Sequence, residues 1–241
     1  MSQPNKMESG DRGYIHRLLY GSGDARLRAT WRTIIPLLAG LVVYLAGQML
    51  IPVAFRLVVH DVSGTNAVLW TVVLFTLLAA VIGLSGLVAV LVASRLDKRP
   101  PASYGFNVST RWGAEFLVGV LIGVIASVGT VLYHVARGYG ILQPKVTGVG
   151  VDSIFLGVIV GLALLLFFLA NNVFEEILFR AIFIQNAAEG LRTRSVGNTS
   201  AVLIALIASA PVFGMLHLLG NGGAADVLTS LVGGVLFGTA Y

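Results

Sequence analysis

The sequence predicts an all-α protein: a polytopic bundle of about six to seven transmembrane helices. Of the 241 residues, 56% are hydrophobic and only 11% are charged, whereas soluble domains carry about 25% charged residues. The mean hydropathy is +0.88, and the 29 glycines are typical of closely packed membrane helices. This composition excludes a disordered chain, a disulfide scaffold and a typical cytosolic enzyme.

Six apolar stretches predict the individual helices. A bilayer core of ~30 Å is crossed by about 20 apolar helical residues, and the candidate stretches are 34–55, 67–93, 114–136, 154–188, 200–219 and 226–241. The fourth is long and polar in its middle, so it is either one spanning helix or a pair of pieces that bend apart near Asn171. The last has 16 residues, or ~24 Å of helix, so we expect it to be truncated at Tyr241.

The charges predict two regions and an orientation. Residues 1–33 form a basic cytoplasmic arm, and residues 34–241 form the transmembrane helical domain. With the amino terminus inside, the inner segments hold twelve Lys and Arg residues and the outer segments three, as the positive-inside rule requires. We therefore expect a multi-pass protein of the plasma membrane with a cytoplasmic amino terminus. The basic arm fits a surface of anionic lipid and not nucleic acid.

A polar cluster in the fourth stretch is the first candidate site, because a charge inside a membrane helix costs ~2.5–3.5 kcal/mol. Glu176 and Arg180 are four residues apart and share a helix face, where they can form an ion pair. Glu175 points ~100° away from Glu176, so its carboxylate is left to face another partner. Asn171 and Asn172 precede Glu175 by four and three residues and can hydrogen-bond it or a water beside it.

His217 is the second buried titratable candidate, and Phe213 lies on the same helix face four residues before it. The short loop 189–199 predicts that the helices carrying Glu175 and His217 form an antiparallel hairpin. Glu175 lies ~21 Å from one end of this loop and His217 ~27 Å from the other, so the two side chains can share one pocket. A carboxylate beside an imidazole suits general base chemistry.

Each of these residues also has a purely structural interpretation. The ion pair of Glu176 with Arg180 can simply fasten helices together, and the two asparagines can serve as interhelical hydrogen-bonding groups. A histidine near a helix end is common at interfaces. The pairing of Glu175 with His217 at similar depth favours a functional site over these alternatives.

At these residues the sequence resembles the CAAX protease and bacteriocin-processing family, which includes the type II CAAX prenyl endopeptidases. Residues 175–180 read EEILFR and match its EExxxR motif, and residues 213–217 read FGMLH and match its FxxxH motif. The resemblance covers about residues 114–241. It implies an all-α membrane enzyme that cleaves peptide bonds in or beside the bilayer, acting on a lipidated CaaX tail in the prenyl-processing members.

The resemblance also implies residue roles. Glu175 would be the general base that activates water, His217 its partner, and the pair of Glu176 with Arg180 the support of the site. The family resembles glutamate-type proteases, so we expect no metal and no cofactor. The expected partners are membrane lipid and a lipidated or extended peptide.

One family motif is missing from this chain. The third motif, HxxxN, supplies a second His and an Asn that stabilise the oxyanion, but no His follows His217. Asn221 lies four residues after His217, yet that histidine already belongs to FxxxH, so we interpret the match as coincidental. We expect the motif beyond Tyr241. Loss of one oxyanion donor typically slows an enzyme ~10²–10³-fold, so the sequence leaves the activity of the 241-residue chain in question.

Two questions remain open at the level of sequence. The rival function is a non-catalytic membrane scaffold or a bacteriocin self-immunity protein, and a transporter is a third reading that no internal repeat supports. The predicted orientation places the site ~20–27 Å above the inner loop, although CaaX tails are cytosolic. Either a water-filled cavity reaches the site from the cytosol, or one apolar segment does not span the membrane.

Overall fold

A computed structural model describes residues 13–14, 16, 18–20, 26–59, 64–106, 109–141, 154–219 and 223–238. All its named elements are helices, which confirms the predicted class. In chain order they are α2 (Ala29–Val58), α3 (Gly64–Asp97), η1 (Pro101–Tyr104), α4 (Trp112–Ala136), α5 (Ile154–Glu175), η2 (Glu176–Ile184), α6 (Gln185–Leu191), α7 (Asn198–Leu216), η3 (His217–Leu219) and α8 (Gly223–Gly238).

Five helical stretches in the described part of the chain are long and apolar enough to cross a membrane, and α8 is a shorter apolar helix. These six agree with the six apolar stretches of the sequence. The first of the spanning helices in the described part of the chain, α2, starts at Ala29, five residues before the apolar stretch that predicted it. The protein is therefore an integral, multi-pass membrane protein with a helical bundle architecture.

The fourth apolar stretch is a single continuous helix and does not break near Asn171. It runs through α5, η2 and α6, from Ile154 to Leu191. Its middle part, η2, is a π-helix of nine residues that begins directly after Glu175. Such π segments are rare and frequently occur at functional sites. The irregularity thus begins within the polar cluster, at Glu176, and leaves Asn171 in regular α-helix.

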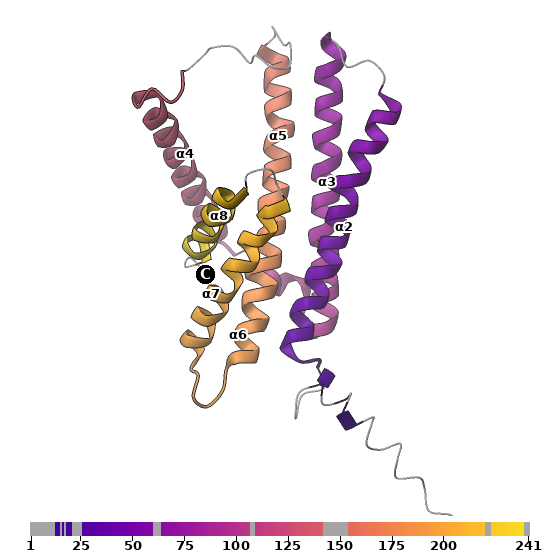
Figure 1. Cartoon of the computed structure of the whole chain (residues 1–241), viewed down its shortest axis with the longest axis vertical. Coiled ribbons are helices and arrows are strands. Elements are labelled where there is room, and N and C mark those ends of the chain that lie inside the picture. Colours follow the sequence, from indigo (N-terminus) through magenta and orange to yellow (C-terminus); the bar gives the residue numbers. More distant parts are fainter. Residues whose placement is uncertain are drawn as a thin grey trace, which may run out of the picture.

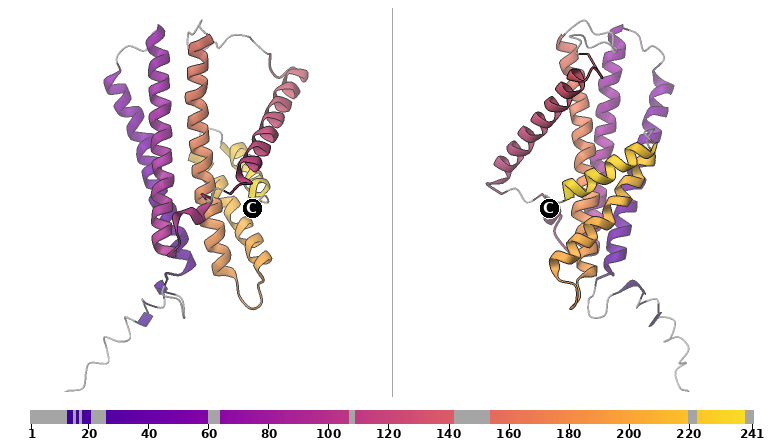
Figure 2. Two further views of the ribbon diagram at one scale, coloured as in Figure 1. Left: turned by 180° about the vertical axis from the view of Figure 1, so that it is seen from behind. Right: turned by 60° about the vertical axis from the view of Figure 1, so that its left-hand side comes forward.

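The continuous helix of α5, η2 and α6 packs against α2 and α3 and against α7, while α4 stands apart (Figures 1 and 2). The antiparallel helices α2 and α3 pack together, and α3 packs along α5. The segment of η2 and α6 forms the predicted antiparallel hairpin with α7, and α8 crosses α7. By contrast, α4 leans away from the bundle, and none of its residues is buried.

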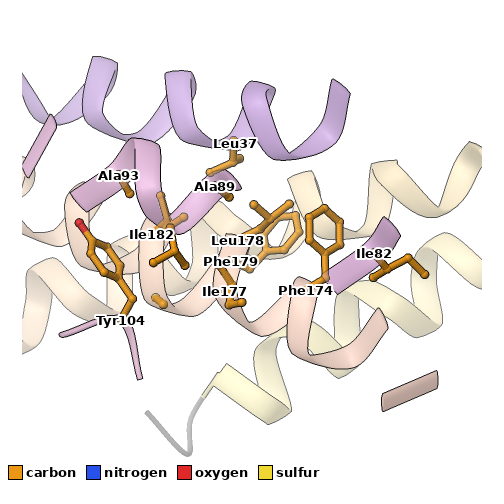
Figure 3. Close-up of a cluster of buried hydrophobic side chains, with 12 residues drawn as sticks. Leu37, Ile82, Ala89, Ala93, Tyr104, Phe174, Ile177, Leu178, Phe179 and Ile182 are labelled. Carbon is orange, nitrogen blue, oxygen red and sulfur yellow. The ribbon is translucent and has the colours of Figure 1, made fainter. Parts of the chain in front are cut away.

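The main core forms where η2 packs against α2 and α3. Figure 3 shows this cluster, in which Leu178 and Ile182 of η2 are almost completely buried with Ile82 and Ala89 of α3. Gly40 permits the close approach of α2 to α3, because a Cβ atom added at Gly40 would lie only 3.0 Å from the Ala89 Cβ. Because the buried side chains of η2 pack tightly against both α2 and α3, η2 holds these two helices in place.

A buried polar network joins the helix ends near the amino-terminal arm. Arg32 of α2 is only 3% exposed, and its guanidinium donates to the Asp97 carboxylate of α3 at 3.0 Å. The Tyr104 hydroxyl donates to the other Asp97 oxygen at 2.5 Å. Burial and this hydrogen bond raise the pKa of Tyr104 above its usual value, so the hydroxyl remains a donor. From α6, Asn186 donates its amide to the Arg32 carbonyl at 3.1 Å.

Glu189 extends this network to the loop after α3. Its carboxylate accepts from Arg26 at 2.7 Å, from Arg32 at 3.2 Å and from Arg99 at 2.5 Å. The three segments that the charge count assigned to one side of the membrane therefore meet at one end of the bundle. Among the predicted outer residues, Arg56 lies in the last turn of α2 and Arg137 directly follows α4, and both of these helix ends lie at the other end of the bundle. Lys145 lies outside the described residues.

Replacing Arg32 tests the importance of the network. Arg32→Met leaves Asp97 buried without its cation, so we expect a loss of about 3–5 kcal/mol in the free energy of unfolding. Chemical denaturation in mixed micelles would measure this loss. Arg111→Met, which removes an exposed arginine, is the matched control and should leave stability unchanged. Equal stability of both variants would contradict a structural role for the network.

Candidate active site

Glu175 ends α5, and its carboxylate is held by a short chain of hydrogen bonds. The Asn171 amide, one helical turn earlier, donates to the Glu175 Oε1 at 2.7 Å. The Asn171 Oδ1 in turn accepts from the Tyr44 hydroxyl of α2 at 3.3 Å. The predicted contact of Asn171 with Glu175 is confirmed, and the contribution from α2 is new. Within the described part of the chain, this hydrogen bond reaches only Oε1, so the other carboxylate oxygen is available to a ligand.

His217 lies directly after α7, and its ring is fixed by Phe213. The imidazole Nδ1 is 3.0 Å from the Phe213 carbonyl oxygen, and the two rings pack edge to face with centroids 4.8 Å apart. Because a carbonyl oxygen can only accept, Nδ1 must carry a proton. In the neutral ring Nε2 is then the unprotonated nitrogen, and it is free of partners among the described residues.

Glu175 and His217 are brought together at the boundary between two cavities. Both residues line both cavities, together with Phe179 and Phe213, whose rings pack edge to face 5.0 Å apart. The sequence prediction that residues from two helices share a pocket is therefore reproduced by the geometry. The aromatic rings keep the surroundings of the two polar groups apolar.

The two cavities differ in their outer walls. The cavity on the α2 side has a volume of about 430 Å³ and the cavity on the α8 side about 480 Å³. The α2-side cavity is lined in addition by Leu41, Tyr44, Leu45 and Gln48 of α2 and by Asp226 of α8. The α8-side cavity is lined in addition by Ser209 of α7 and by Thr229, Ser230, Gly233 and Gly234 of α8.

The remaining predicted residues support this boundary from η2 and α5. Arg180 pairs with Glu176 four residues earlier, as the spacing predicted, and both side chains line the α8-side cavity. Asn172 also lines that cavity, whereas Asn171 faces the other one. Asn221, the residue of the doubtful third motif, lies outside the described residues.

Sequence reasoning missed the α2 residues of the site. Tyr44 and Gln48 are four residues apart, so they share one face of a helix that is otherwise almost wholly apolar. That spacing is a signal that a search for polar pairs in the first apolar stretch would have found. Asp226, at the start of α8, carried no comparable signal because it also fits the end of a polar turn.

Metal binding finds no support in the described part of the chain. No group of three or more His, Cys, Asp or Glu side chains there is placed to hold a metal ion. A chelator is a necessary control in any assay.

Part of the chain matches the model of a known protein family. The family model described as "Type II CAAX prenyl endopeptidase Rce1-like" matches residues 157–241. The matched segment contains Glu175 and His217. The match supports the resemblance to the CAAX protease and bacteriocin-processing family that the two motifs indicated. Comparisons with curated proteins and with solved structures gave no match.

The position of the proton on His217 is a testable consequence of the Phe213 contact. In the neutral ring we expect the Nδ1–H tautomer, because the Phe213 carbonyl accepts from Nδ1. Selective ¹⁵N labelling of histidine, with His16, His60 and His134 replaced by Gln, would allow the two ring nitrogens to be distinguished by NMR. A neutral ring that carries its proton on Nε2 instead of Nδ1 would contradict this geometry.

Proposed function

We infer from the CAAX-protease-like character of residues 157–241 that this multi-pass membrane protein is an intramembrane endopeptidase. In this proposal Glu175 is the general base, His217 its partner, and water the nucleophile. The substrate is a lipidated or extended peptide that reaches the site from the membrane. The amino terminus is cytoplasmic, and the protein resides in the plasma membrane.

The observation that carries the proposal is the position of Glu175 and His217 between two cavities. An endopeptidase must accommodate chain on both sides of the bond that it cleaves. Each cavity, at about 430 and 480 Å³, is large enough for a part of a ligand. A peptide that extends from one cavity into the other would place its backbone beside both catalytic groups.

The proposed reaction needs only a water molecule and these two side chains. Glu175 takes a proton from water, and the oxygen attacks the carbonyl carbon of the peptide bond. His217 accepts a hydrogen bond from the water at its unprotonated Nε2 and so orients it. When the C–N bond breaks, Glu175 returns its proton to the leaving amine. The overall change is hydrolysis, with both side chains restored.

Two local features support this chemistry. The ion pair of Glu176 with Arg180 neutralises the neighbouring charges, so Glu175 is not competing with Glu176 for the same cation. The apolar rings of Phe179 and Phe213 line both cavities, which lowers the local dielectric and strengthens the interactions of a charged transition state.

Cleavage of a peptide panel tests the proposal. The full-length gene product in lipid or mild detergent would be incubated with farnesylated and unmodified CaaX peptides and with other lipidated peptides. We expect Glu175→Gln and His217→Gln each to reduce kcat/KM by about 10²–10⁴, the range of general base catalysis. Cleavage in the presence of a chelator would show whether a bound metal contributes.

Matched carboxylate variants give the controls. Glu115→Gln removes an exposed carboxylate of α4 and should leave the rate unchanged, while Glu176→Gln should reduce it less than Glu175→Gln. If the folded wild-type protein cleaves no peptide, and all variants are equally stable and monodisperse, the result favours the scaffold or self-immunity reading.

A further inference from the structure

We propose that Tyr44 of α2 is a positioning residue that orients the Glu175 carboxylate through Asn171. The proposal rests on the proposed function, because it assigns Tyr44 to the same site. Tyr44 belongs to a helix outside the matched segment 157–241. The inference would therefore extend the site to the amino-terminal half of the chain.

The hydrogen bonds run from the Tyr44 hydroxyl to Asn171 and from Asn171 to Glu175, each donor preceding its acceptor in this order. A phenol hydroxyl is the only donor between Tyr44 and the Asn171 Oδ1, which are 3.3 Å apart. This contact holds the amide oxygen toward α2 and leaves the amide nitrogen facing Glu175, 2.7 Å from Oε1. With the amide reversed, its oxygen would face the carboxylate and repel it. The Glu175 carboxylate, which can only accept, thus sets the orientation of the Asn171 amide, and the Tyr44 hydroxyl holds the amide in that orientation by donating to Oδ1.

The Tyr44 ring is held independently of its hydroxyl. It stacks on Phe174 with centroids 4.9 Å apart and planes only 5° from parallel. Phe174 is buried and precedes Glu175 in the chain, so the stack joins α2 to the end of α5. A phenylalanine in place of Tyr44 would preserve this contact and remove only the hydrogen bond.

The consequence concerns the position of the base. Glu175 lines both cavities, and its side chain can rotate unless Oε1 is held. A displacement of about 1 Å at a reacting group can cost ~10²-fold in rate. Tyr44 therefore acts on kcat by fixing the carboxylate and does not itself bind substrate in this proposal.

Kinetics of Tyr44→Phe test the proposal where cleavage is observed. We expect kcat to fall about 10- to 100-fold with KM within about twofold of wild type. Tyr133→Phe, an exposed tyrosine on α4, is the matched control and should behave as wild type. An unchanged kcat, or a change confined to KM, would overturn the positioning role.

A double variant separates positioning from a general loss of structure. Asn171→Leu should reduce kcat at least as much as Tyr44→Phe, and the combined variant should be no slower than Asn171→Leu alone, because Tyr44 acts only through Asn171. Additive losses in the double variant would show that Tyr44 acts by another route and would overturn the proposal.

Infrared spectroscopy tests the same contact without a substrate. The difference spectrum between wild type and Glu175→Gln isolates the carboxyl bands of Glu175. We expect Tyr44→Phe to shift these bands and Tyr133→Phe to leave them in place; unshifted bands in Tyr44→Phe would overturn the proposal. If the wild-type protein cleaves no peptide, the proposed function fails, and this spectrum alone decides the role of Tyr44.

Discussion

The arrangement of the bundle depends on the ion pairs of the buried Arg32 guanidinium. A cation that is almost completely removed from water must be paired, and Asp97 and Glu189 supply the carboxylates. These partners belong to α3 and α6, so the ends of three helices are fixed at one point. The hairpin of η2 and α6 with α7 is thereby fixed at the α6 end, which holds its residues at a constant position along the bundle.

The π-helix η2 connects this fixed end to the candidate site. Its buried face, with Leu178 and Ile182, packs on α2 and α3, while its polar residues Glu176 and Arg180 line the α8-side cavity. Glu175 precedes the irregular segment and faces both cavities. One helical stretch thus performs two tasks, because its apolar face anchors it and its polar residues remain accessible.

Sequence reasoning succeeded where the relevant distances were local. The pair of Glu176 with Arg180 and the contact of Asn171 with Glu175 follow from helix geometry alone, and both were predicted. The hairpin followed from a short loop. Reasoning from sequence did not find Tyr44, because its partner lies 127 residues away in the chain, nor did it find the π form of residues 176–184, whose spacing also fits an α-helix.

By itself, the sequence determined that this is an all-α membrane protein, because its apolar content and its scarcity of charge leave no soluble alternative. It also determined which polar residues are costly in a bilayer and therefore demand partners. Only the tertiary structure decided which partners come from distant parts of the chain, such as Asp97 for Arg32 and Tyr44 for Asn171. The association of α2 with α3 and α6, which buries Arg32 and brings Tyr44 to Asn171, depends on side-chain packing between distant segments, and no local spacing encodes it.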